Sequence, residues 1–239
     1  MLALNAQAQN DTMYIMKDGA VINQYSMHKS DVDSIVFYEP LQTVTDIEGN
    51  VYRVVIIGDQ FWMAENLKTT KYNDGTSIPN VTDATAWSQL ATGSLCDYNN
   101  TPKNSTTYGK LYNWYAVNTG KLCPIDWHVS TDAEWKALTT YLGGETAAVG
   151  KLKEIGTTHW RAPNERATNE TGFTALPGGY RNSTSGEFDY IGVTSDFWTA
   201  TESQTLETDA WYRRMTYEGN KVHSSLDKKT GFSVRCLKD

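Results

Sequence analysis

Residues 127–144 read WHVSTDAEWKALTTYLGG and carry the clearest local structure in the chain. Apolar residues recur at helical intervals before the two closing glycines, namely Trp135, Leu138 and Leu142. Thr131 precedes Glu134 by three residues, which is the spacing of a capping box at a helix N-terminus. The stretch therefore predicts a short strand at 127–129 that runs into a helix beginning after Thr131.

Toward the N-terminus, residues 44–70 predict further strands. A β-branched run covers Val51–Ile57, glycine-containing turns flank it on both sides, and the aromatic segment FWM follows at 61–63. Strongly β-forming runs joined by tight turns are typical of antiparallel hairpins. This part of the chain is therefore expected to be a strand–turn–strand unit.

The turn before that run raises the question of calcium. Asp46, Glu48 and Asn50 present oxygen atoms at alternate positions, as calcium loops do, but no Glu stands at the twelfth position of an EF-hand. An ordinary turn explains the same residues. We expect no cofactor in this protein, and a structural calcium ion stays open.

The remaining segments predict loops, a short helix and short strands. Residues 73–109 are rich in Asn, Thr, Ser, Gly and Asp, which predicts long loops. Residues 108–117, YGKLYNWYAV, place apolar side chains on one helical face and predict a short, mostly buried helix. From 157 onward glycines and asparagines separate aromatic pairs, which favours short strands.

Charge and cysteine usage exclude several classes of protein. The net charge of -7 argues against nucleic-acid binding, because that affinity depends on clustered Lys and Arg. No stretch approaches the length of an apolar membrane span. Cys96, Cys123 and Cys236 form no CxxC pair, so a structural zinc site is not expected. Three cysteines permit one disulfide with one free thiol, or three buried thiols.

The N-terminal residues indicate export. Residues 1–9, MLALNAQAQ, contain an A-x-A pattern behind a short apolar run, typical of the tail of an export signal, although a flexible N-terminus is the alternative. Residues 10–40 predict a small β-hairpin appendage around Asp18-Gly19, with a further strand at 31–38. This piece resembles the leader of many secreted Bacteroidetes proteins. We therefore expect a secreted, periplasmic or outer-surface location.

Six motifs occur in an order that matches one bacterial family. They are FWMAENLK at 61–68, YGKLYNW at 108–114, WHV at 127–129 with DAEW at 132–135, NETGF at 169–173, LPGGYR at 176–181 and GFSVRCL at 231–237. Together they resemble the Fibrobacter succinogenes major paralogous domain, from about Val44 to the C-terminus. That family occurs in secreted and surface proteins and resembles the C-type lectin-like superfamily, which also includes the formylglycine-generating enzymes.

The resemblance implies a fold for residues 41–239. It is an α+β, C-type-lectin-like fold with short twisted antiparallel sheets, two or so short helices and long irregular loops. The first strand, at 127–129, would pair antiparallel with the last, at 233–237. That pairing implies a Cys123–Cys236 disulfide, with a Cys96–Cys236 pairing or three unpaired cysteines as alternatives.

The sequence assigns no catalytic or metal-binding residue. None of the histidines has a recognised zinc spacing, and neither a G-x-S-x-G elbow nor a phosphate loop is present. Asp126, His128 and Ser130 would share one strand face, but that spacing is poorly suited to a proton relay. Formylglycine-generating enzymes use cysteines late in their domain, where this chain has only Cys236, so their chemistry is not implied.

Aromatic residues between 157 and 212 are the better candidates for ligand contact. The resemblance places the ligand-facing loop in this region, and sugars stack on exposed aromatic rings while charged side chains fix their hydroxyls. The candidate ligand-binding residues are Trp160, Tyr180, Arg181, Trp198, Glu202 and Trp211. The competing interpretation for each Trp is a place in the core.

Three functions follow from this reasoning. The first is a secreted recognition or adhesion module that binds a glycan or a surface protein without catalysis. The second is an enzyme on a formylglycine-generating-type scaffold. The third is a structural subunit of a surface or fimbrial assembly, in which residues 11–38 dock a partner by strand pairing.

Overall fold

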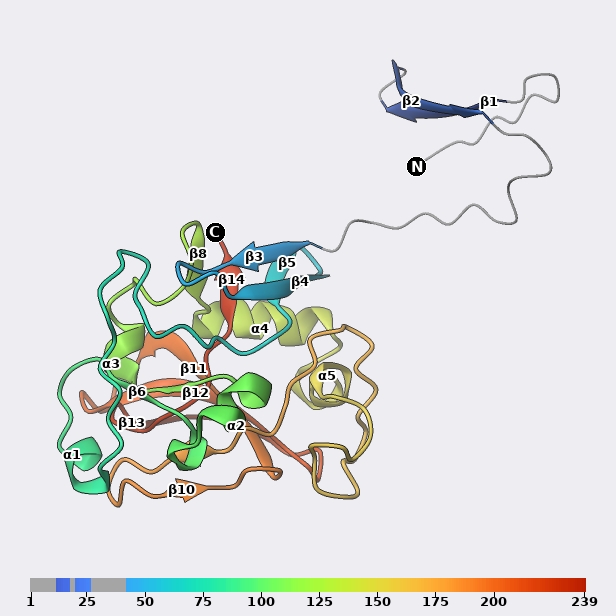
Figure 1. Ribbon diagram of the computed structural model, residues 1–239. Coiled ribbons are helices and arrows are strands. Elements are labelled where there is room, and N and C mark those ends of the chain that lie inside the picture. Colours follow the sequence, from blue (N-terminus) through green and yellow to red (C-terminus); the bar gives the residue numbers. More distant parts are fainter. Residues whose placement is uncertain (1–11, 18–19, 27–41) are drawn as a thin grey trace. The chain divides into compact units, whose positions relative to one another are not determined.

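The computed structural model describes residues 12–17, 20–26 and 42–239, and its contacts divide the chain into Met1–Pro40 and Leu41–Asp239. In the first unit β1 (Thr12–Lys17) pairs antiparallel with β2 (Ala20–Ser26) (Figure 1). This is the hairpin expected around Asp18-Gly19. The export-signal remnant at 1–9 and the strand expected at 31–38 lie outside the described residues.

The second unit contains a five-stranded antiparallel sheet of order β3-β4-β5-β14-β8. Its strands are β3 (Thr43–Thr45), β4 (Val51–Ile57), β5 (Gln60–Met63), β14 (Cys236–Lys238) and β8 (Trp127–Val129). Cys236 lies opposite Val129, so the last strand pairs antiparallel with the strand that precedes the capped helix. This is the pairing that the family resemblance implies, and it places the C-terminus beside β8 in Figure 1.

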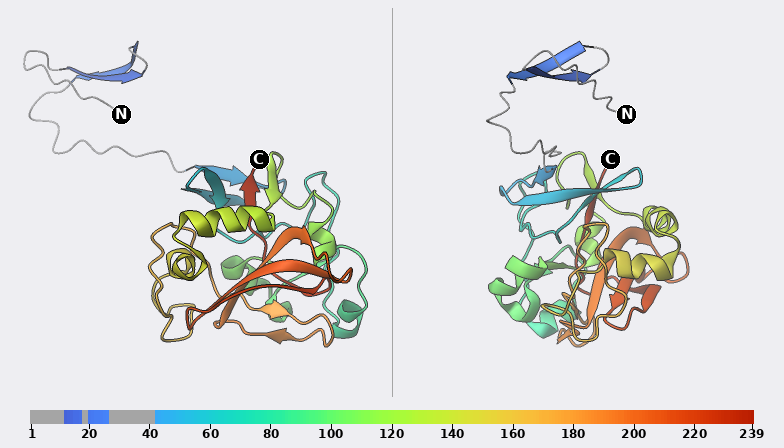
Figure 2. Two further views of the ribbon diagram at one scale, coloured as in Figure 1. Left: turned by 180° about the vertical axis from the view of Figure 1, so that it is seen from behind. Right: turned by 90° about the vertical axis from the view of Figure 1, so that its right-hand side faces the viewer.

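The unit also contains a three-stranded antiparallel sheet. It contains β11 (Thr194–Glu202), β12 (Asp209–Thr216) and β13 (Lys221–Asp227). Two helices, α4 (Asp132–Tyr141) and α5 (Glu145–Leu152), lie beside it, and Figure 2 shows α4 running between the two sheets. Helices and short antiparallel sheets make up this unit, so the fold class is α+β, as expected.

Helix α4 begins where the sequence predicts. The Thr131 hydroxyl accepts from the Glu134 N–H at 3.3 Å, and the Glu134 carboxylate accepts from the Thr131 N–H at 2.7 Å. These two bonds satisfy N–H groups that have no partner inside the helix. The capping box is therefore confirmed.

The space between the two sheets is filled by aromatic rings. Trp135 of α4 packs against Trp62 of β5 with centroids 5.0 Å apart, and against Phe197 of β11 at 5.6 Å. All three side chains are buried. Burying such large rings is strongly favourable, which explains how a chain with modest overall hydrophobicity supports a core. The packing fixes α4 and both sheets relative to one another.

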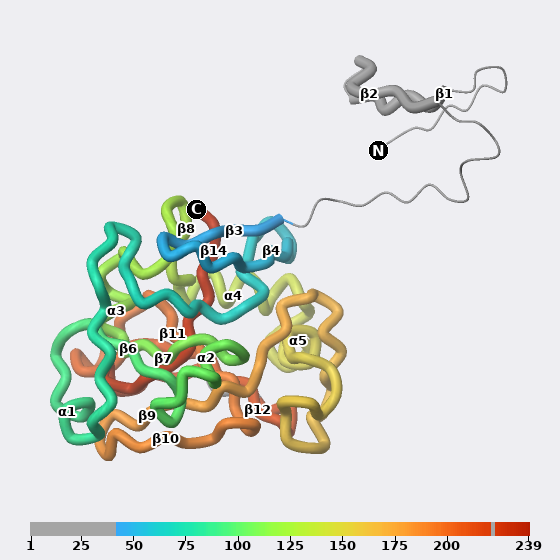
Figure 3. Tube along the Cα trace, in the orientation of Figure 1, coloured from blue at the N-terminus to red at the C-terminus, as the bar shows by residue number. Residues whose placement is uncertain are grey.

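Shorter helices and strands lie within residues 84–117 and 180–189 (Figure 3). They are α1 (Ala84–Ser88), β6 (Leu95–Cys96), a 3-10 turn (Tyr98–Asn100), α2 (Pro102–Tyr108), β7 (Leu111–Tyr112), α3 (Trp114–Val117), β9 (Tyr180–Arg181) and β10 (Phe188–Asp189). The single helix predicted for 108–117 is confirmed only over Trp114–Val117, because Leu111 and Tyr112 form β7. Tyr112 instead exchanges backbone hydrogen bonds with the distant Phe232, at 2.8 and 3.0 Å, and this pairing overrides the local helical pattern.

A disulfide links the segment just before β8 to the last strand. Cys123 and Cys236 are bonded with an S–S distance of 1.98 Å, and Cys96 is a free, buried thiol. Of the pairings considered from the sequence, the structure therefore has the one implied by the family resemblance.

Candidate functional site

The two tryptophans Trp160 and Trp198 lie in the core rather than on a binding face. They are 1% and 0% exposed, respectively. Their indole N–H groups donate to backbone carbonyls, that of Trp160 to Ala175 at 3.0 Å and that of Trp198 to Tyr112 at 2.9 Å. Neither ring face nor N–H group is available to a ligand, so the expectation of ligand contact is corrected for both.

Arg181 is likewise a structural residue. Its side chain is buried between the rings of Trp87 and Phe188, with its guanidinium carbon 4.4 and 4.7 Å from their centroids. Three of its N–H groups donate to the carbonyls of Val81, Thr82 and Gly186. The guanidinium thereby holds two loops together. Because its N–H groups are used in these contacts, the expectation that Arg181 binds a ligand is corrected.

Tyr180 and Glu202 are accessible but lie apart from each other. Tyr180 is half-buried and stacks on Tyr190 with centroids 5.7 Å apart. Glu202 is exposed and forms an ion pair with Lys228. The Tyr180 ring instead lies against Arg214, which is opposite Asp196 on β11, six residues before Glu202. The residues predicted as one binding surface are therefore not assembled into one.

Trp211 is the predicted tryptophan that stays at the surface. It is half-buried on β12, and its ring lies against the imidazole of His223 on β13 with centroids 4.5 Å apart. Because side chains alternate along a strand, Trp211 shares a sheet face with Arg213 and Met215. That face is the one toward α4 and α5.

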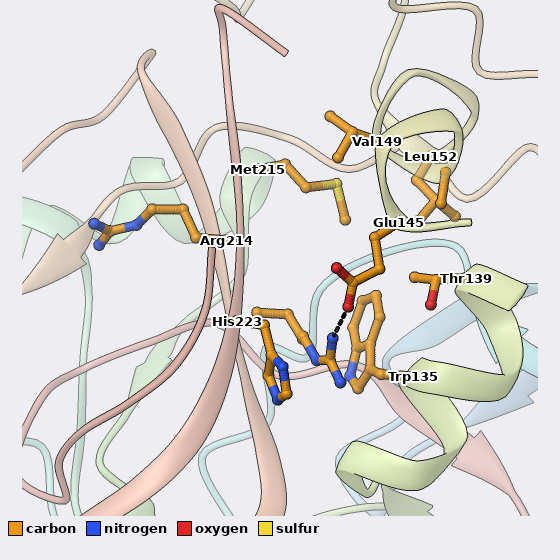
Figure 4. Close-up of a pocket in the computed structure, with 10 residues that line it drawn as sticks. Trp135, Thr139, Glu145, Val149, Leu152, Arg214, Met215 and His223 are labelled. Atoms are coloured by element: carbon orange, nitrogen blue, oxygen red, sulfur yellow. Dashed lines mark hydrogen bonds and ion pairs between the residues drawn. The ribbon is translucent and has the colours of Figure 1, made fainter. Parts of the chain in front are cut away.

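A pocket opens near this tryptophan (Figure 4). It lies between α4, α5 and the face of β12 and β13 that carries Arg213, Met215 and His223. Its lining residues are Trp135, Thr139, Glu145, Ala148, Val149, Leu152, Arg213, Arg214, Met215 and His223. Figure 4 shows the Arg214 side chain directed away from the others. Its guanidinium pairs with buried Asp196 on the other face of the sheet.

Charged side chains at the mouth of the pocket form a network. The Arg213 guanidinium donates to an Asp132 carboxylate oxygen at 2.6 Å and to Glu145 at 3.4 Å. His223 Nε2 lies 2.7 Å from the same Asp132 oxygen. Asp132 is the first residue of α4, where a negative charge also favours the helix dipole. Together with Trp211, the network presents an aromatic face beside hydrogen-bonding groups.

Sequence reasoning missed this network because it depends on strand register. Arg213 and His223 are directly opposite each other in the β12–β13 pair. Asp132 approaches them only because α4 packs against the sheet. The alternation of Trp211, Arg213 and Met215 was visible in the sequence, but nothing local indicated which face of the strand would meet the helices.

The candidate calcium loop is closed by hydrogen bonds. The Asp46 carboxylate accepts from the backbone N–H groups of Glu48 and Asn50 at 3.0 and 2.9 Å, and from the Tyr52 hydroxyl at 2.8 Å. These bonds account for the turn without an ion. Within residues 42–239 and the described hairpin, no group of three His, Cys, Asp or Glu side chains could hold a metal. In the same part of the chain no helix is long and apolar enough to cross a membrane.

The cysteines do not provide a reactive thiolate. Burial raises the pKa of the Cys96 thiol to about 12, so it is protonated at neutral pH. Cys123 and Cys236 are consumed by the disulfide. Cysteine chemistry of the formylglycine-generating type therefore has no support in this domain.

His128 belongs to an ion-pair cluster different from the one weighed in the sequence. Its Nδ1 lies 2.6 Å from the Asp239 carboxylate and its Nε2 lies 2.9 Å from Glu134. The hydrogen bond to Glu134 is the main cause that raises the pKa of His128 to about 9. Burial alone would raise the pKa of Glu134, but hydrogen bonds from His128 and Thr131 outweigh it and lower that pKa to about 2. The cluster ties the C-terminus to the start of α4.

This cluster predicts a pH-dependent stability. Because the folded-state pKa of His128 lies above its ordinary value near 6.5, its stabilisation is full below pH 6.5 and is lost as the pH rises toward 9. The ring is about a third exposed, so screening reduces the effect to about 1 kcal/mol. We expect the difference in free energy of unfolding between wild type and His128→Asn to shrink by that amount between pH 6 and 9.5, measured by urea unfolding. A difference that is constant over this range, or unaffected by 1 M salt, would contradict the ion pair.

Comparison with known proteins gives a family and no activity. No curated protein and no solved structure matches the chain significantly. Residues 55–238 match the family model described as the Fibrobacter succinogenes major domain. Because this match covers well over half of the chain, the protein belongs to the Fibrobacter succinogenes major domain family.

Proposed function

We propose that the domain is a carbohydrate-recognition module whose ligand lies over Trp211 and reaches the adjacent pocket. The observation that carries the proposal is a half-buried indole, still accessible at the surface, beside the polar network of Asp132, Arg213 and His223. Sugar rings offer an apolar C–H face to an aromatic ring and hydroxyls to charged groups. The surface provides both partners within one area.

The disulfide supports an extracytoplasmic setting for this module. Disulfides form and persist in oxidising compartments such as the periplasm and the cell surface. The Cys123–Cys236 bond is thus consistent with the export expected from residues 1–9. A secreted or surface-exposed adhesion role follows as part of the same proposal.

Replacing the Trp211 ring tests the proposal directly. We expect Trp211→Ala to weaken glycan binding about 30-fold, because a central aromatic contact contributes about 2 kcal/mol to such interfaces. Binding is first surveyed on a glycan array, and the affinity for the best ligand is then measured by calorimetry. Because the half-buried ring also packs against His223, circular dichroism and the melting temperature check that the variant is folded at the temperature of the binding measurement.

Tyr141→Ala is the matched control, because Tyr141 is an aromatic residue that is 68% exposed at the end of α4 and does not line the pocket. It should leave the affinity unchanged. Equal losses in both variants, or an array on which the wild type binds no glycan, would refute the proposal. Release of reducing ends from a bound polysaccharide would favour the enzyme alternative instead.

A further inference from the structure

We infer that the pocket beside Trp211 receives the acetyl group of an acetylated glycan, an inference that rests on the carbohydrate-binding function proposed above. The ligand class is a sugar polymer carrying acetamido or O-acetyl substituents. Four features of the pocket support this: its small volume, its apolar inner wall, two buried N–H donors without acceptors, and its position near Trp211.

The pocket is too small for a sugar ring. Its cavity volume is about 30 Å³. A single water molecule needs roughly 10–15 Å³ measured in this way, so the space suits a group of only a few heavy atoms. A substituent on a sugar can enter it, while the ring itself stays outside on the surface.

The inner wall is apolar. It is formed by Val149 and Leu152 of α5 and by Met215 of β12 (Figure 4). Ala148 of α5 also lines the pocket. A hydroxyl group placed against these side chains would lose its hydrogen bonds to water without replacement. A methyl group would instead gain from burial, so the wall selects an apolar substituent over a free hydroxyl.

Two side chains of the pocket have N–H donors with no acceptor among the described residues. They are Nε1 of Trp135, which is 1% exposed, and Nε of Arg213, which is 6% exposed. Buried donors without partners are rare, because each leaves a desolvated polar group unpaired. A carbonyl oxygen in the pocket would supply the missing acceptor. Methyl and carbonyl together make an acetyl group.

The position of the pocket fits a ligand stacked on Trp211. Arg213 is two residues further along β12 on the same face, about 7 Å away at the rise of an extended strand. His223 joins the two features, since it contacts the Trp211 ring and also lines the pocket. A sugar ring on Trp211 therefore directs a neighbouring substituent toward the cavity.

The test compares ligands that differ in acetylation. Calorimetry on the full chain would use N-acetylglucosamine tetramer against cellotetraose, and acetylated xylo-oligosaccharides against the same material after alkaline deacetylation. We expect at least one acetylated ligand to bind tenfold or more tightly than its partner, and the two pairs distinguish an N-acetyl from an O-acetyl source. Equal affinity within both pairs, or no binding of any of these ligands by a protein that binds other glycans, would overturn the inference while the proposed function stands. Absence of binding to every glycan on the array would remove both.

Filling the cavity provides the second measurement. We expect Ala148→Leu to abolish the preference for the acetylated ligand, whereas Ala147→Leu, the same change on the exposed side of α5, should preserve it. If Ala148→Leu does not fold, Trp135→Phe removes the indole N–H and keeps an aromatic ring, and it should reduce the preference at least threefold. A preference unchanged in the folded variants would overturn the inference.

Discussion

Replacing Cys123 and Cys236 together by alanine is expected to lower the free energy of unfolding by about 5 kcal/mol. The bond closes a loop with a sequence separation of 113 residues. In the loop-entropy model a cross-link of this span removes about that much free energy from the unfolded chain. Since domains are typically stable by only about 5–15 kcal/mol, the variant should be close to unfolding at ambient temperature. Urea unfolding followed by tryptophan fluorescence measures the change.

The control for this prediction is the free thiol. Cys96→Ala removes a buried sulfur and should cost only about 1 kcal/mol. Reductant should destabilise wild type and Cys96→Ala equally and leave the double variant unchanged. An unfolding midpoint of the wild type that does not respond to reductant under denaturing conditions would contradict the prediction.

Replacing Arg235 by methionine is expected to lower the free energy of unfolding by about 3–5 kcal/mol, because several buried acceptors lose their donors. The guanidinium is 1% exposed, and burial lowers the pKa of Arg235 to about 9, so the group is still charged at neutral pH. Among the described residues it has no carboxylate partner within ion-pair distance. Its N–H groups donate instead to the carbonyls of Met63, Phe173 and Thr174 and to the side chain of Asn66.

The expected loss of stability arises because the oxygen atoms that accept from Arg235 lose their hydrogen bonds. Methionine fills much of the same space but leaves buried carbonyl oxygens without donors, each at a cost of about 1–3 kcal/mol before relaxation. Arg53→Met is the matched control, because Arg53 is 52% exposed and pairs only at the surface with Glu65. It should change stability by less than about 1 kcal/mol. Similar urea midpoints for the two variants would show that the hydrogen bonds of Arg235 contribute little to the free energy of unfolding.

Local signals predicted the elements whose determinants are close in sequence. The capping box at Thr131 and the turn after Val51–Ile57 operate over a few residues, and both elements formed where expected. The family motifs added one long-range feature, the pairing of the last strand with β8. From that pairing the Cys123–Cys236 partners followed.

Tertiary structure decided which tryptophan faces solvent. Trp160, Trp198 and Trp211 are chemically the same side chain, and their sequence contexts are similar mixtures of strand-forming and polar residues. Trp198 points into the core because β11 is covered on that face by Tyr112 and Phe232. Trp211 is only half-buried, and it does not line the pocket where Arg213 and Met215 of the same face meet α4 and α5. The burial of a side chain depends on which distant segments of the chain pack against it. The residues next to it in the sequence do not encode this.

The sequence by itself thus determined the α+β class, the capped helix, the hairpin of β4 and β5, and, through the family motifs, the disulfide. The candidate site was decided only by the tertiary structure. Its polar side chains come from α4, β12 and β13, and they meet because of the register of the two strands and the packing of the helix against them. Local propensity acts over a few residues, whereas a binding surface depends on contacts between segments that are distant in the chain.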